Sequence, residues 1–207
     1  MGPYDRAMSR VTPLRDDRPG LPAPCATCVF WQDRHRASDR ARKERWAESM
    51  RERDGAWGLV LWDGDRFEGL VQYGPARSFP RANVLPSGPP SRDAALVTCI
   101  FLSEEDPIGV SERLLLEALA DLQARGVDAV EAFGVDEPDV APGAGHRTLL
   151  DIDLLERLGF ARVRATPPVA LMRLELGGLE PSRSHIGISA RLQRLVRPPA
   201  VRPASSK

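Results

Sequence analysis

The sequence has few cysteines and no long apolar run, and both shortages limit its class. Its 207 residues include 3 cysteines, an odd number, whereas a disulfide-stapled secreted domain needs an even and denser set. No segment approaches the roughly 18 apolar residues that cross a bilayer, and the N-terminus lacks the apolar core of a signal peptide. We therefore expect reduced thiols, no membrane span and a cytoplasmic location.

A net charge is also absent. The 29 basic side chains balance 29 acidic ones, so the chain has no global field that would draw it to nucleic acid. The hydrophobic fraction of 42% is sufficient for a packed interior, and 28% charged residues give a polar surface. A chain of this length and composition predicts one folded domain.

Both ends differ from the middle of the chain. Residues 1–23 mix prolines with charges and show no period, which predicts a disordered arm before a domain at 24–178. The tail at 179–207 is basic and is expected to be mostly disordered, with one short amphipathic helix. That tail could be a frayed helix without a role, or an arm that binds a partner, a membrane or nucleic acid. Its helical face would contain Ile188, Leu192, Leu195 and Val196.

Hydrophobic periodicity predicts an α/β domain with a parallel crossover. A strand, a helix and a strand at 94–102, 109–125 and 129–135 imply a parallel crossover. The proline-rich segment 74–92 predicts a long loop. The other expected strands are 28–31, 56–62, 66–73, 161–165 and 169–176, and the other expected helices are 38–53 and 149–158.

Several segments resemble the GNAT acyltransferases. The element order and the segments LVTCIFL (96–102), VEAFG (130–134) and LLERLGF (154–160) are similar to that superfamily. The segments CATCVFW (25–31), FPRA (79–82) and EAFG (131–134) resemble a divergent subgroup with an N-terminal CxxCxFW motif. The resemblance covers roughly residues 24–176.

The resemblance implies a mixed sheet that holds acyl-CoA where two parallel strands splay. The family's phosphate loop begins with a cation or an amide, but here it reads DPIGVS (106–111), with Asp106 at that position and two glutamates before it. The loop is therefore degenerate, although a helix start can still bind an anion, with Ser111 as the expected cap. The implied acetyl-CoA contacts are the backbone of Ile100, Phe101, Leu102, Gly109, Val110, Ser111, Glu112 and Arg113.

Two residues are candidate catalytic groups. Glu131 interrupts an apolar strand, where a carboxylate can serve as a base; alternatively, it is a structural carboxylate paired with an arginine or placed at a solvated sheet edge. Tyr73, at the end of a strand, is a candidate proton donor or an ordinary strand-end aromatic residue. The family's frequent tyrosine acid corresponds to Leu155 here.

Cys25 and Cys28 form half of a zinc site. Their two-residue gap suits two thiolates on one metal, but a structural zinc site needs four ligands. Cys99 and His35 would complete it only if the fold brought them close. We expect no metal and thiols that pack in the core.

These observations predict a CoA-dependent N-acyltransferase that transfers an acetyl group to a primary amine of a small molecule or a protein. A non-catalytic binding or regulatory module with the same fold is the alternative, and a basic tail carried by a scaffold domain is a third. The sequence leaves open the acceptor amine, the acyl group and the choice between monomer and homodimer.

Overall fold

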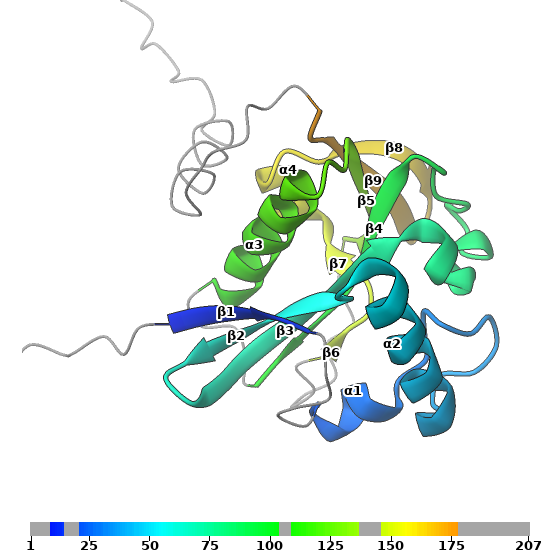
Figure 1. The fold of residues 1–207 in the computed structure, drawn as a ribbon. Coiled ribbons are helices and arrows are strands. Elements are labelled where there is room, and N and C mark those ends of the chain that lie inside the picture. Colours follow the sequence, from blue (N-terminus) through cyan, green and yellow to red (C-terminus); the bar gives the residue numbers. More distant parts are fainter. Residues whose placement is uncertain (1–8, 15–20, 104–108, 137–145, 178–207) are drawn as a thin grey trace, which may run out of the picture.

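A twisted mixed sheet with helices on both faces forms the body of the protein (Figure 1). The computed structural model describes residues 9–14, 21–103, 109–136 and 146–177. The main path of the sheet has the order β1-β2-β3-β4-β5-β9-β8, while β6 pairs with β4 and β7 pairs with β5. The strands are β1 (Ser9–Pro13), β2 (Gly58–Asp63), β3 (Arg66–Pro75), β4 (Ala94–Leu102), β5 (Ala129–Val135), β6 (His146–Arg147), β7 (Leu150–Asp151), β8 (Ala161–Thr166) and β9 (Val169–Glu175). The helices are α1 (Ala23–Thr27), α2 (Arg40–Asp54), α3 (Val110–Ala124) and α4 (Ile152–Arg157), with 3-10 turns at η1 (Ala76–Ser78) and η2 (Pro80–Asn83).

Local sequence signals explain where the long helices start and stop. Asp39 caps α2 by accepting a hydrogen bond from the Arg42 N–H at 3.0 Å, and Gly55 ends the helix with φ of 76°. Gly109 precedes α3 with φ of 75°, a backbone conformation that favours glycine. The expected Ser111 cap is wrong, because Ser111 already lies within the helix and is buried.

The predicted parallel crossover is confirmed. β4 pairs in parallel with β5 from Ala94 opposite Ala129 to Val97 opposite Ala132, and α3 connects the two strands. On its other edge β4 pairs antiparallel with β3, where Gln72 lies opposite Cys99 and Tyr73 opposite Val97. That register skips Thr98, so β4 carries a β-bulge at this residue.

The two faces of the sheet bury different cores. The α3 and α4 face is a single apolar cluster that includes Leu115 of α3, Leu155 of α4 and Ile100 of β4. The opposite face, under α1, α2 and the η1–η2 segment, is rich in aromatic residues, among them Trp31 and Trp57. The sheet is therefore covered on both faces, as the apolar strands β4 and β5 require.

Some sequence expectations differ from the structure. Residues 9–13 belong to the predicted disordered arm but form β1, which pairs antiparallel with β2. Segment 28–31 is not a strand, because Cys28 makes only an isolated bridge with Ser38 and a short helix, α1, precedes it. Strands β6 and β7 were not expected. The predicted tail helix lies outside the described residues, and within the described part no helix is long and apolar enough to cross a membrane.

Candidate functional site

The parallel pairing of β4 and β5 ends halfway along both strands. Its last register pair is Val97 with Ala132, immediately before the bulge at Thr98. A bulge bends its strand and increases the local twist, which gives β4 a physical reason to diverge from β5 at this point. Beyond this point, the two strands no longer pair with each other, and their open halves form the splay that the resemblance associates with acyl-CoA.

Short strands from the chain itself lie in this splay. On the β4 side, Ile100 pairs with Arg147 and Phe101 pairs with His146 of β6. On the β5 side, Gly134 pairs with Leu150 and Val135 with Asp151 of β7. The backbone of Ile100 and Phe101, which the sequence assigned to the cofactor, is thus flanked by β3 on one edge and β6 on the other.

The start of α3 lies beyond the open half of β4, which ends at Leu102. Of its predicted cofactor contacts, Gly109 is exposed and Ser111 is buried. The Arg113 N–H donates to the Gly109 carbonyl at 3.0 Å as the first turn of the helix closes, so this N–H is already used. The Arg113 side chain donates to Ser9 Oγ at 2.7 Å and thereby ties α3 to β1.

Glu131 lies on β5 in the paired half, and its side chain is 1% exposed. Its carboxylate accepts the Ser91 N–H at 2.8 Å and the Ser91 hydroxyl at 2.6 Å. Arg173 of β9 donates to the same carboxylate at 3.2 Å, and hydrogen bonds to Glu175 and then to Asp93 raise the pKa of this guanidinium. Glu131 therefore has the arginine-paired arrangement that was the alternative to a catalytic base.

Tyr73 lies on the α3 face and also has a fixed partner. Its hydroxyl donates to Asp121 of α3 at 2.5 Å, and Arg125 pairs with the same Asp121 oxygen at 2.7 Å. Burial, and then the nearby negative charge of Asp121, raise the pKa of Tyr73. Tyr73 thus lies near the C-terminal end of α3, about 16 Å along the helix axis from the residues near Gly109.

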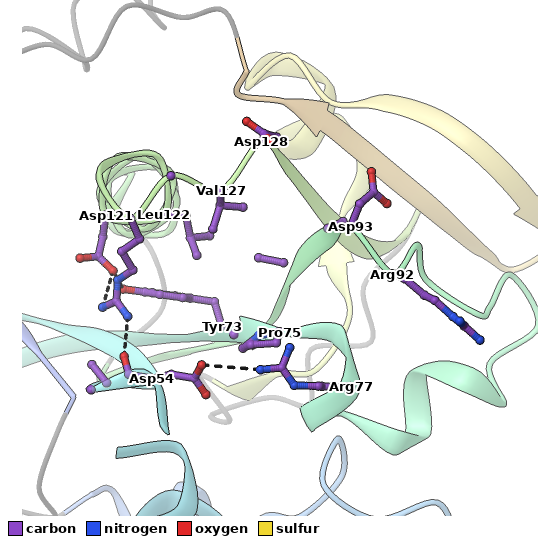
Figure 2. A pocket seen from close by; sticks show the side chains of 17 residues that line it. Asp54, Tyr73, Pro75, Arg77, Arg92, Asp93, Asp121, Leu122, Val127 and Asp128 are labelled. Carbon is purple, nitrogen blue, oxygen red and sulfur yellow. Dashed lines mark hydrogen bonds and ion pairs between the residues drawn. The ribbon is translucent and has the colours of Figure 1, made fainter. Parts of the chain in front are cut away.

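A cleft of about 750 Å³ opens beside Tyr73 (Figure 2). Its walls come from the ends of α2 and β3, the end of α3 with the turn that leads to β5, and the start of β4. Asp54 and Asp121 lie on one side of the cleft, where Arg125 pairs with Asp121 and donates to the Asp54 carbonyl. Asp93 and Arg92 lie across the opening, with the Arg92 side chain pointing away from it (Figure 2). The predicted proton donor therefore borders a polar cleft at the end of α3 remote from the splay.

A buried polar network at the bulge was missed by sequence reasoning. Gln72 of β3 donates to Thr98 Oγ1 at 2.8 Å and accepts from Lys43 Nζ at 2.6 Å and from Gln32 Nε2 at 3.0 Å. The Lys43 ammonium also lies over the Trp46 and Trp57 rings, 4.7 and 4.8 Å from their centroids. These hydrogen bonds fix the side chain of Thr98 where the two strands begin to diverge.

The cysteines show the features of packed thiols. Cys25 and Cys99 are buried, and burial raises the pKa of both thiols, that of Cys99 to about 12. Cys28 is partly exposed. Over the described ranges, no three His, Cys, Asp or Glu residues are grouped so that they could hold a metal ion.

The segments 25–31, 79–82 and 131–134, on which the sequence-based expectation of a subgroup rests, meet on the aromatic face. The Trp31 ring lies 5.7 Å from the Phe133 ring, and the Arg81 N–H donates to the Trp31 carbonyl at 3.3 Å. The Arg81 guanidinium donates to the Phe30 and Asp33 carbonyls and lies 4.3 Å from the Phe30 ring. In this structure these residues build a core, and they do so on the face opposite α3.

Arg147 is the other residue that sequence reasoning missed. It is half-buried in β6, and its Nε is shielded from solvent without a hydrogen-bond partner. No ion pair joins it to another residue of the described part. The sequence around Arg147 is a polar loop in an arginine-rich chain, and nothing in it indicates that this side chain is partly buried without a hydrogen-bond partner for its Nε.

Comparison with solved structures identifies the architecture. An N-acetyltransferase from Staphylococcus aureus Mu50 superposes with a TM-score of 0.52 at 13% identity, covering 82% of this chain and 99% of its own. A protein from Acinetobacter baylyi ADP1 assigned as an acetyltransferase gives 0.55 at 14% identity, with 87% and 99% covered. The chain has the GNAT acetyltransferase fold.

A third match is a structure with its own cofactor bound. A Salmonella typhimurium protein whose structure contains acetyl-CoA matches with a TM-score of 0.50 at 18% identity, covering 85% of this chain and 99% of its own. No protein-family model and no curated protein sequence matches the chain. At these identities the similarity establishes the fold, and any activity has to be argued from the chain's own residues.

Proposed function

We propose that this protein is a CoA-dependent N-acyltransferase that transfers an acetyl group to a primary amine. The observation that carries the proposal is the β4–α3–β5 unit, in which parallel strands separate at the Thr98 bulge and α3 begins beyond the open half of β4. The proposed contacts are the backbone of residues 100–102 and the α3 start at residues 109–112, without the N–H of Arg113. When bound, acetyl-CoA would supply a thioester whose acyl carbon is attacked by the acceptor amine.

Electrostatics at the start of α3 set the expected affinity. A helix N-terminus offers roughly half a positive charge, which is worth about 0.3 to 1 kcal/mol per favourable anion at an exposed site. Glu104, Glu105 and Asp106 precede it in the sequence and oppose an anion by a comparable amount. Binding should therefore be weaker than for a family member that begins this loop with a cation or an amide.

A melting-temperature titration with acetyl-CoA tests the proposal. A ligand at about 100 times its dissociation constant stabilises the folded state by about 2.7 kcal/mol, so saturable binding is readily visible. Asp106→Arg should strengthen binding, because it removes a repulsion and adds a charge-assisted hydrogen bond. Gly109→Asp should abolish it, because φ of 75° is unfavourable for a side chain and the new carboxylate repels phosphate. If neither wild type nor Asp106→Arg responds to millimolar acetyl-CoA, the proposal fails.

The catalytic roles of Glu131 and Tyr73 remain part of this proposal. To act as a base, Glu131 would have to exchange a hydrogen bond from Ser91 or Arg173 for one from the acceptor amine. Tyr73 would have to release Asp121 in the same way. Turnover assays of Glu131→Gln and Tyr73→Phe test these roles; unchanged rates in both variants would leave solvent as the proton acceptor.

A non-catalytic module is the second candidate, supported by the position of β6. Because β6 pairs with Ile100 and Phe101, the strand edge proposed for the cofactor already has a partner. Absence of acetyl-CoA binding, or binding with no transfer to any of a panel of primary amines, would favour this module. Transfer to one of these amines at a rate above that of the Gly109→Asp variant would exclude it.

A further inference from the structure

The Arg147 guanidinium has an unused hydrogen-bond donor in a partly buried place. Its Nε is buried without a hydrogen-bond partner, while the residue as a whole keeps some exposure to solvent. Buried polar groups are nearly always hydrogen-bonded, and a charged donor without a partner is among the most costly exceptions. An arginine held in this way is therefore suited to an anion that reaches it from solution.

The register of β6 places Arg147 on a particular face. Arg147 lies directly opposite Ile100 in an antiparallel pair, and directly opposed residues project from the same face of a sheet. Ile100 belongs to the apolar core under α3 and α4. Arg147 therefore lies in the splay on the α3 and α4 face, next to the strand that leads to the loop before α3.

Three other arginines have carboxylate partners within the described part of the chain, in contrast to Arg147. Arg173 is shared by three carboxylates, and Arg125 is held by Asp121 and the Asp54 carbonyl. Arg162 lies near Asp136 and Glu156. Among the residues that the structure describes, Arg147 has no such carboxylate.

We propose that Arg147 binds a phosphate group of the ligand that occupies the splay, and so supplies from β6 the cation that the loop at 106–111 lacks. This inference rests on the proposed function, because acetyl-CoA carries phosphate groups. A guanidinium presents a planar set of N–H donors that matches two phosphate oxygens. The orphaned Nε–H and a neighbouring Nη–H provide such a pair.

Binding measurements with phosphate-bearing and phosphate-free probes test the role of Arg147. The probes are acetyl-CoA, inorganic pyrophosphate and pantetheine, which lacks phosphate, each titrated by calorimetry or by NMR. Arg147→Gln should weaken acetyl-CoA and pyrophosphate about tenfold, equivalent to about 1.4 kcal/mol, and leave pantetheine unchanged. Arg147→Lys should retain part of the affinity, because the charge remains and the paired donors are lost.

Arg157→Gln is the matched control. Arg157 is exposed on α4, which covers the same face, so its removal deletes the same charge without touching the proposed contact. Its effect on acetyl-CoA should be less than twofold. In addition, pyrophosphate should shift an arginine Nε–H resonance that is missing from the spectrum of Arg147→Lys.

The outcomes separate this inference from the proposed function. If wild type binds acetyl-CoA and Arg147→Gln binds it equally well, the inference is overturned and the function stands. If wild type binds pyrophosphate through Arg147 and acetyl-CoA not at all, the phosphate site stands and the proposed function fails. Equal losses in Arg147→Gln and Arg157→Gln, or a loss of pantetheine binding, would also overturn the inference. A melting temperature of ligand-free Arg147→Gln several degrees below wild type, with unchanged affinities, would assign Arg147 to the fold.

Discussion

The paired and splayed halves of the β4–β5 unit differ in whether their polar side chains have hydrogen-bond partners. In the paired half, Glu131 is held by Ser91 and Arg173, and Tyr73, beside Val97 of β4, is held by Asp121. In the splayed half, Arg147 lies beside Ile100 with a buried donor that has no partner. The two catalytic candidates from the sequence, Glu131 and Tyr73, thus lie in the half where β4 and β5 pair. Arg147, which has an unused hydrogen-bond donor, lies in the half where the strands separate.

The difference shows why chemical type alone is a weak guide to a site. A carboxylate in an apolar strand is costly unless donors compensate it, and in this fold Ser91 and Arg173 provide them. Where strand pairing stops, the fold can leave a donor unsatisfied for a ligand. Substitutions of polar side chains in the two halves should therefore have different consequences: loss of stability in the paired half and loss of binding in the splayed half.

Glu131→Gln should give the largest change in stability. The substitution turns one oxygen that faces Ser91 or Arg173 into an N–H donor and removes the charge opposite the Arg173 guanidinium, while the carboxylate position itself is 1% exposed. Hydrogen bonds to charged groups are worth about 1.5 to 3 kcal/mol, so we expect the free energy of unfolding to fall by about 2 to 3 kcal/mol. Urea denaturation at neutral pH measures it.

Glu175→Gln is the control for that experiment. Glu175 pairs with the same Arg173, but its side chain is 64% exposed, so its loss should cost well under 1 kcal/mol. Equal effects of the two substitutions would contradict the structural role assigned to Glu131. Unchanged stability together with reduced acetyl transfer would instead support Glu131 as the base.

Gly134→Ala should have the next largest effect, and it tests the splayed half. A Cβ at Gly134 would lie 2.7 Å from Ile152 Cγ1 and 3.2 Å from Leu155 Cδ1, so the start of α4 would have to move. Such overpacking typically costs about 1 to 3 kcal/mol. Thermal or urea unfolding measures the loss. Gly177→Ala, whose Cβ would meet Asp128 at 3.4 Å, is the control, and a loss as large there would show that steric contact is not the cause.

The strongly periodic part of the fold could be predicted from the sequence. The apolar run of β4 and the amphipathic pattern of α3 are local properties, and both elements lie within one or two residues of their expected bounds. The two-residue strand β6 has no such signal, because its pairing comes from β4. Similarly, β1 gains its strand structure from β2, and its own sequence, SRVTP, has little strand character.

The candidate site was harder to predict for the same reason. The partner of Tyr73 lies 48 residues away on α3, and the partner of Glu131 lies 40 residues away in the proline-rich loop. Neither pairing can be recognised until the crossover brings those segments together. The environment of Arg147 is equally non-local, because its position depends on where β4 and β5 stop pairing.

Tyr73→Phe should give the smallest change at neutral pH and a characteristic one at high pH. The variant loses one hydrogen bond to Asp121, which Arg125 still holds, so the expected cost at pH 7 is about 1 kcal/mol. Burial raises the pKa of Tyr73 in the folded state, while in the unfolded chain the phenol titrates near its ordinary value of about 10. Above that pH the unfolded state loses the proton while the folded state keeps it, so wild-type stability is intact below about pH 10 and falls as the pH rises further.

Because phenylalanine does not titrate, the stability of Tyr73→Phe should decline less between pH 9 and 11, and the difference in stability between the two proteins should narrow. Urea midpoints across that range measure the narrowing. Parallel stability curves would mean that the Tyr73 hydroxyl titrates normally in the folded protein and is not held by Asp121. The paired half of the unit would then contain a phenol that is free to act as a proton donor.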